Sequence, residues 1–262
     1  MKPSRFPDIR LRPGESIDPF LGGSLRLIQS RNGYRFSIDA VLLSRFVSIR
    51  PKDVMVDLGT GCGIIPLLVL STRPAARAVG LEIQPELAGQ AARNAVLNGF
   101  GHKMAVIRGD LRNPPMRKAC ADVVTCNPPY RKARSGRINP DHRRAIARHE
   151  ILADMDDILR AARHLLKKKG RLALVYPADR MADLFTRMRR FDIEPKRLQV
   201  HYPDIRSDAK LVLVEGARGA RPGLAVSPPV LGQGNPDLEF SPAGTGGPVN
   251  TSDQEKNRDC DP

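Results

Sequence analysis

Short runs of apolar residues alternate along the chain with segments whose apolar positions repeat at helical spacing. The runs predict five strands: Val54–Leu58, Ala78–Glu82, Met104–Arg108, Ala121–Cys126 and Arg171–Tyr176. Helix-period segments lie between or after them, at 64–73, 85–98, 152–168 and 179–190. This alternation predicts βαβ units and a parallel sheet covered by helices on both faces.

Two further apolar runs, Ile193–His201 and Lys210–Glu215, follow the last helix-period segment. No helix long enough for a crossover separates them, so they should pair antiparallel. We therefore predict an α/β, Rossmann-like fold with a seven-stranded, mostly parallel sheet and an antiparallel C-terminal strand pair. In such sheets, ligands bind at the carboxyl ends of the strands.

The first 50 residues should form a hairpin and a helix. Leu25–Gln29 and Tyr34–Ile38 flank Asn32-Gly33, the dipeptide that a type I′ hairpin turn prefers. A helix should follow at about residues 38–48. We expect this N-terminal unit, residues 1–50, to close over a cofactor as a lid.

Residues 216–262 differ in composition from the rest of the chain. They are rich in Gly, Pro, Ser, Asn and Asp, and their apolar residues are too scattered to bury a face, which predicts a mostly disordered tail after a main domain at 51–215. The tail holds four basic and six acidic side chains, so the chain's net charge of +15 leaves +17 for residues 1–215. This excess favours a nucleic acid partner, although it also suits simple solubility.

Membrane spans and metal sites are not predicted. No apolar stretch approaches the roughly 18 residues of a membrane helix. The charged N-terminus is followed by no apolar segment of a secretory signal, so we predict a cytoplasmic protein. The four cysteines, at 62, 120, 126 and 260, form no Cys-x-x-Cys pair and have no zinc-like histidine spacing.

A glycine-rich turn, Gly59-Thr60-Gly61-Cys62-Gly63, directly follows the first predicted strand of the main domain. Gly59, Gly61 and Gly63 allow the backbone to approach a ligand where a Cβ would clash. The spacing is neither that of a dinucleotide fingerprint nor that of a P-loop. With Asp57 two residues before the first glycine, the turn resembles the Asp-x-Gly-x-Gly-x-Gly loop of class I methyltransferases, which holds the methionine end of S-adenosylmethionine.

Two acidic residues follow the next two predicted strands. Glu82 ends its strand about 20 residues past the glycine turn, where an acid can accept both hydroxyls of a ribose. Asp110 follows the next strand, and the resemblance implies that it binds the adenine amino group of the cofactor. Either acid alone could be a solvated charge at a strand end. Their equivalent positions at the carboxyl ends of successive strands favour cofactor binding.

The fourth predicted strand leads into Asn127-Pro128-Pro129-Tyr130. An exocyclic adenine amine is a poor nucleophile because its lone pair is delocalised into the ring. If the Asn127 amide oxygen and the Pro128 carbonyl accept its two hydrogens, the lone pair localises and can attack the sulfonium methyl group in line. Two prolines stiffen this backbone, and Tyr130 can stack on the base. We predict that these four residues are catalytic and that Asn127 also contacts the cofactor.

The glycine turn and Asn-Pro-Pro-Tyr together resemble the class I methyltransferases that modify amino groups: adenine N6 in DNA or RNA, guanine N2 in RNA, or glutamine N5 in release factors. Residues 33–43, Gly-Tyr-Arg-Phe-Ser-Ile-Asp-Ala-Val-Leu-Leu, and Ala147-Arg148-His149-Glu150 narrow the resemblance. They are similar to the family that methylates N6 of the adenosine beside the anticodon of a valine tRNA. The similarity covers about residues 20–215 and leaves the tail outside.

Basic residues concentrate directly after the tetrapeptide, where residues 131–150 hold seven bases and two acids. Such a segment suits contact with phosphates, although a solvated loop is the alternative. The residues that we predict to bind RNA are Arg131, Lys132, Arg143, Arg144 and Arg148.

The sequence thus predicts an S-adenosylmethionine-dependent methyltransferase that acts on adenine N6 in RNA, and tRNA is the favoured RNA substrate. Two alternatives stay open: a release factor glutamine N5-methyltransferase, whose substrate presents a similar planar NH2, and an RNA-binding module without chemistry.

Overall fold

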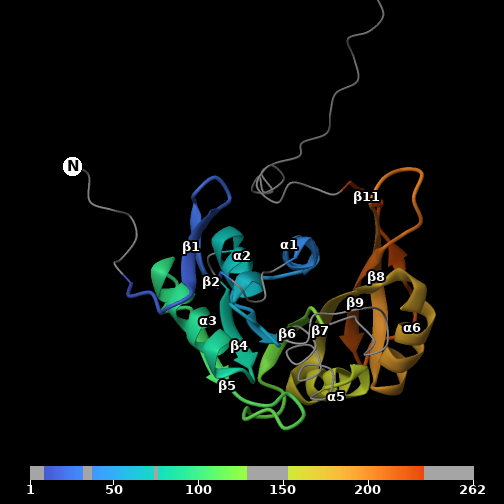
Figure 1. Cartoon of the computed structure of the whole chain (residues 1–262). Helices are drawn as coiled ribbons and strands as arrows, with labels where there is room; N and C mark the ends of the chain where they lie inside the picture. The colour runs from blue at the N-terminus through green and yellow to red at the C-terminus, as the bar shows by residue number, and fades with distance from the viewer. Residues whose placement is uncertain (1–8, 32–36, 74–75, 129–152, 233–262) are drawn as a thin grey trace, which may run out of the picture.

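The computed structural model describes residues 9–31, 37–73, 76–128 and 153–232. Within these residues the main sheet has nine strands in the order β10-β8-β9-β7-β6-β3-β4-β5, with β11 paired to β8 (Figure 1). The seven long strands are β3 (Val54–Leu58), β4 (Arg77–Glu82), β5 (Met104–Arg108), β6 (Ala121–Cys126), β7 (Leu166–Pro177), β8 (Ile193–Tyr202) and β9 (Leu211–Arg218). They confirm the seven predicted strands.

Strand direction follows the predicted pattern. The strands β3 to β7 pair parallel to one another, whereas β9 pairs antiparallel with both β7 and β8. Because β8 and β9 are joined without a crossover helix, they have to run in opposite directions. The predicted antiparallel C-terminal pair is confirmed.

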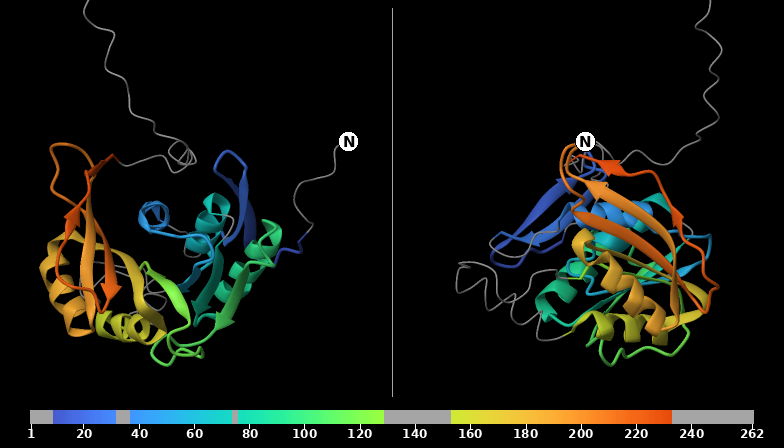
Figure 2. Two further views of the ribbon diagram at one scale, coloured as in Figure 1. Left: turned by 180° about the vertical axis from the view of Figure 1, so that it is seen from behind. Right: turned by 90° about the vertical axis from the view of Figure 1, so that its right-hand side faces the viewer.

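Helices cover both faces of the sheet, as Figures 1 and 2 show. One face packs against α1 (Ile38–Phe46), α2 (Ile64–Thr72) and α3 (Pro85–Leu97), and the other against α5 (Met155–Leu165) and α6 (Met181–Arg190). Neighbouring residues of β3 face opposite layers: Met55 belongs to the first core and Val56 to the second. This alternation is the period of two that a strand imposes on its side chains.

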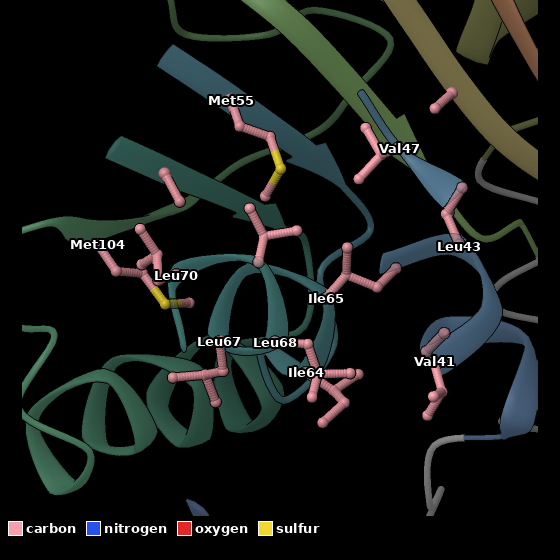
Figure 3. Close-up of a cluster of buried hydrophobic side chains, with 14 of the residues drawn as sticks. Val41, Leu43, Val47, Met55, Ile64, Ile65, Leu67, Leu68, Leu70 and Met104 are labelled. Atoms are coloured by element: carbon pink, nitrogen blue, oxygen red, sulfur yellow. The ribbon is translucent and has the colours of Figure 1, made fainter. Parts of the chain in front are cut away.

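The first core layer is centred on α2, whose residues from Ile64 to Leu70 are all buried. Figure 3 shows their side chains between Met55 of the sheet, Met104 and the side chains of α1. A helix that is apolar on all sides has to be enclosed on all sides. The glycine turn that precedes α2 is therefore anchored on a helix that is enclosed in the core.

The N-terminal hairpin differs from the prediction. It pairs β1 (Glu15–Phe20) with β2 (Leu25–Ser30), so the partner of the predicted strand Leu25–Gln29 precedes it in the chain. The turn between them contains Leu21, Gly22 and Gly23, all with positive φ angles, which the two glycines adopt without strain and Leu21 adopts at a cost. The predicted partner strand at 34–38 is wrong at its end, since Ile38 begins α1; the Asn32-Gly33 turn lies outside the described residues.

The predicted tail is also corrected between residues 216 and 232. Strand β9 continues to Arg218, and the short strands β10 (Ala225–Val226) and β11 (Val230–Leu231) pair parallel with β8. The side chain of His201 adds a hydrogen bond from Nε2 to the Gly232 carbonyl at 2.9 Å. The main-chain groups of the edge strand β8 stabilise this segment, which an argument from apolar burial overlooks. Residues 233–262 lie outside the described part.

Among the described residues, no helix is both long enough and apolar enough to span a membrane.

Candidate functional site

The predicted site residues that the structure describes lie at the carboxyl ends of the parallel strands. Leu58 at the end of β3 is paired with Cys126 of β6 on one side and with Leu81 of β4 on the other. The glycine turn, Glu82 and Asn127 each follow these positions by one residue. Register thus places three separate sequence motifs side by side, as the prediction required.

The glycine turn has the backbone that its sequence predicts. Gly59, Gly61 and Gly63 have φ angles of +67°, +58° and +87°, a region that other residues enter only at a cost. A Cβ added to Gly59 or Gly61 would meet no other atom of the described residues within 4 Å, whereas one added to Gly63 would lie 2.8 Å from Met104 Cε. The first two glycines therefore border open space that a ligand can occupy. The third is needed for close packing against Met104.

Hydrogen bonds fix the turn to the neighbouring strand. The amides of Gly59 and Thr60 both donate to the Leu81 carbonyl, at 2.9 and 3.1 Å, and the Gly61 amide donates to Glu82 Oε2 at 2.9 Å. Gly80 makes the close approach possible, because a Cβ there would lie 2.6 Å from the Thr60 side chain.

Asp57 lies fully buried beneath the turn. Burial raises its pKa to about 7, and the charge of Glu82 acts in the same direction, while the Thr125 hydroxyl opposes the shift by donating to Asp57 Oδ1 at 2.6 Å. Thr125 lies opposite Asp57 in the β3–β6 register. The pair joins the strand that carries the glycine turn to the strand that carries Asn127.

Glu82 is buried with 3% of its surface exposed. Its two oxygens accept from the Gly61 and Gln84 amides, both at 2.9 Å. Each carboxylate oxygen has a second lone pair, so Glu82 can shape the turn and still accept two ribose hydroxyls. The sequence predicted the second role and missed the first.

Asp110 lies after β5 and is partly exposed. Arg112 binds its carboxylate through Nε and Nη2, the latter at 2.6 Å, and this hydrogen bonding lowers the pKa of Asp110. The structure thus places Asp110 at the expected strand end, with a cationic side chain where an adenine amine is predicted to bind.

Asn127 and the buried Pro128 directly follow β6. The other predicted catalytic residues, Pro129 and Tyr130, lie outside the described residues. The same holds for the predicted RNA-binding residues Arg131, Lys132, Arg143, Arg144 and Arg148.

The residues present fit S-adenosylmethionine. Two glycines border open space, a buried acid ends β4, and a second acid follows β5, which together offer backbone for the methionine end and acceptors for the ribose and the base. Within the described ranges, no three His, Cys, Asp or Glu side chains come together to hold a metal ion.

Comparisons with known proteins agree with this site. Residues 49–210 match the family model described as a methyltransferase domain. Among solved structures, a "predicted O-methyltransferase" from Agrobacterium tumefaciens superposes with a TM-score of 0.60 at 21% identity, covering 74% of this chain and 86% of that one. This likeness supports the Rossmann-like fold.

Several curated relatives carry the name tRNA1(Val) (adenine(37)-N6)-methyltransferase, and two of them show the extent of the match. The protein from Porphyromonas gingivalis is 34% identical over 57% of this chain and 61% of its own length, and that from Parabacteroides distasonis is 30% identical over 68% and 74%. The chain spans about half to three fifths of the length of the first curated relatives it matches. It belongs, with these relatives, to the class I S-adenosylmethionine-dependent methyltransferases.

Proposed function

We propose that this protein transfers the methyl group of S-adenosylmethionine to N6 of an adenine in tRNA. The observation that carries the proposal is the register of β3 and β6, which puts Asn127 and Pro128 beside the glycine turn. A methyl donor on the turn would therefore lie next to the two groups expected to hold the amine. The names of the relatives, which specify adenine 37 of a valine tRNA, support this substrate.

Four groups of this chain would hold the cofactor. The backbone of Gly59 and Gly61 would border the methionine end, Glu82 would accept the ribose hydroxyls, and Asp110 would accept from the adenine amine. Asp110 would then have to exchange at least one contact with Arg112 for that amine. When bound, S-adenosylmethionine supplies an electrophilic methyl group.

Asn127 and Pro128 would prepare the amine of the substrate. The Asn127 amide oxygen and the Pro128 carbonyl would accept its two hydrogens and turn the nitrogen lone pair toward the methyl group. These contacts strengthen as the nitrogen rehybridises, so they stabilise the transition state more than the ground state. The new bond from nitrogen to the methyl group would replace the bond from sulfur to that group, with S-adenosylhomocysteine as the leaving group. A strong general base is not needed, because the nitrogen becomes acidic as it is alkylated and would release its proton to solvent.

The basic segment at 131–150 would contact the tRNA backbone. The proposal rests on its seven bases directly after Asn-Pro-Pro-Tyr and on the charge of +17 in residues 1–215. The triple variant Arg143→Ala, Arg144→Ala, Arg148→Ala should weaken tRNA binding and flatten the plot of log K against log salt. An unchanged slope would mean that other residues hold the phosphates. A tRNA substrate would also place the enzyme in the cytoplasm.

The proposal is tested by incubating the protein with S-adenosylmethionine labelled in its methyl group and either bulk tRNA or a release factor. Labelled N6-methyladenosine in the digested tRNA is the expected result. Label in a glutamine of the release factor would identify a protein methyltransferase instead, and RNA binding without binding of S-adenosylmethionine would leave a non-catalytic module.

A further inference from the structure

Two asparagines of α3 and its C-terminus fasten the N-terminal hairpin. Asn98 accepts from the Arg26 amide at 2.9 Å and donates to the Arg26 carbonyl at 2.7 Å. Asn94, one helical turn earlier, accepts from the Ile28 amide at 2.7 Å and donates to the Ile28 carbonyl at 3.1 Å. Each carboxamide thus replaces a neighbouring strand at the edge of β2 that β1 leaves open.

Asn94 makes one contact that Asn98 does not. Its Nδ2 also donates to the Cys62 carbonyl at 2.9 Å, and Cys62 lies between Gly61 and Gly63 in the glycine turn. The Asn94 side chain is fully buried. A single carboxamide therefore bonds the hairpin and the glycine turn at once, in a place that water does not reach.

The turn is held from two sides. Glu82 accepts from the Gly61 amide, and Asn94 donates to the next carbonyl along the chain. Glycines on both sides of Cys62 give this backbone a wide choice of conformations, so these two bonds select the observed one. A buried carbonyl that loses its donor has to move or stay unpaired.

We propose that Asn94 is a positioning residue that holds the glycine turn in its cofactor-binding conformation and couples this turn to the N-terminal hairpin. The inference rests on the proposed role of the turn in binding S-adenosylmethionine. It assigns to the hairpin an effect on cofactor affinity that is transmitted through Asn94.

A second anchor of the hairpin supplies a control. The Glu15 carboxylate accepts from Arg93 Nη1 and Nη2, both at 2.6 Å, and from the Arg12 amide at 2.8 Å. The hydrogen bonds from Arg93 lower the pKa of Glu15 to about 2. This anchor joins β1 to α3 without a contact to the glycine turn, so its loss loosens the hairpin and leaves the hydrogen bonds of the turn in place.

The test compares Asn94→Ala with the controls Asn98→Ala and Glu15→Gln, by titration calorimetry with S-adenosylhomocysteine well below the melting temperature of every variant. Asn94→Ala should weaken binding about tenfold to hundredfold, since it leaves a buried carbonyl unpaired. Both controls loosen the hairpin but leave the bond from Asn94 to the Cys62 carbonyl in place, so they should weaken binding less, by about fivefold at most, even where they lower the melting temperature. Equal weakening in all three variants would show that Asn94 acts through general stability and would overturn the proposal.

Hydrogen exchange in the wild-type protein gives a test that does not depend on a variant's folding. Saturating S-adenosylhomocysteine should slow exchange of the Ile28 amide, because coupling between two sites is reciprocal. Unchanged Ile28 exchange on saturation would overturn the coupling. Gly59→Ala separates a failure of the proposed function from a failure of the role proposed for Asn94. If this variant binds cofactor as wild type does, the turn is not the cofactor site and the proposed function loses its basis. If it loses binding while Asn94→Ala matches the controls, only the role of Asn94 is wrong.

Discussion

Replacing Gly63 by alanine should damage the fold more than the same change at Gly59. Gly63 has a φ of +87°, and a left-handed conformation costs a residue with a Cβ about 1–2 kcal/mol. Its new methyl group would lie 2.8 Å from Met104 Cε and 3.2 Å from Ala91 Cβ. Methionine can move, but Ala91 is fixed in α3, so overpacking adds about 1–3 kcal/mol. The total loss in the free energy of unfolding should be about 2–5 kcal/mol.

Gly59→Ala incurs the strain without the clash, because its Cβ would meet no described atom within 4 Å. Its loss in stability should stay near 1–2 kcal/mol. That open space is where we place the cofactor, so binding of S-adenosylmethionine should weaken about tenfold or more. Gly59→Ala is thus expected to reduce affinity more than stability.

Urea unfolding followed by circular dichroism measures the loss of stability, and calorimetric titration measures the loss of affinity for S-adenosylmethionine. Gly89→Ala is the control, since Gly89 lies in α3 and its new Cβ would contact only the Arg12 guanidinium at an ordinary 3.6 Å. This control should leave the protein as stable as wild type or more stable. Equal losses of stability for Gly59→Ala and Gly63→Ala would refute the packing argument.

Three further outcomes follow from the structure. Glu82→Gln and Asp110→Asn should raise the KM for S-adenosylmethionine more than they lower kcat, because both are proposed to contact the adenosine part of the cofactor, away from the reacting methyl group; an unchanged KM would remove them from the site. Burial raises the pKa of Asp57 from 3.8 to about 7, so the folded state retains this proton where the unfolded state has lost it. Ionisation of Asp57 should therefore lower the free energy of unfolding by about 2–3 kcal/mol as the pH rises from about 5 to 7. In urea titrations, Asp57→Asn should abolish this decrease. Truncation after Gly216 removes β10, β11 and the end of β9, so the melting temperature should fall by roughly 5 °C or more, whereas truncation after Gly232 should change it less.

Much of the fold could be predicted because the chain repeatedly alternates short apolar runs, which form strands, with segments of helical period, which form the helices between them. The limits of β3, β5 and β6 agree with the predicted runs to the residue. In β3 and β6 the run is long enough to detect because both strands lie inside the parallel sheet and are mostly apolar, whereas β5 lies at its edge. The hairpin was misplaced because Asn32-Gly33 is the stronger turn signal in sequence, while Gly22 and Gly23 make the turn. The residue types of a turn do not by themselves decide which of two nearby turn sequences, Gly22-Gly23 or Asn32-Gly33, closes the hairpin.

The candidate site was predicted in part. The glycine turn, Glu82 and Asn127 were found from motifs and strand order, and register confirms that they adjoin. Thr125 and Asn94 were missed because their partners are 68 and 32 residues away in sequence. A polar residue on a buried helix face was a usable signal for Asn94, but its partners become known only when β2 and the glycine turn are placed.

Single-turnover methyl transfer by Asn127→Ala tests the central claim most directly. The variant should bind tRNA as wild type does and S-adenosylmethionine within about fivefold of wild type, because the cofactor keeps its other proposed contacts and the Asn127 amide oxygen is proposed to act mainly in the transition state. Its rate of transfer to adenine N6 should fall on the order of 10²–10³-fold, the usual loss when one preorganised hydrogen-bonding group is removed. A rate within about fivefold of wild type, with both affinities unchanged, would contradict the account and show that another group activates the amine.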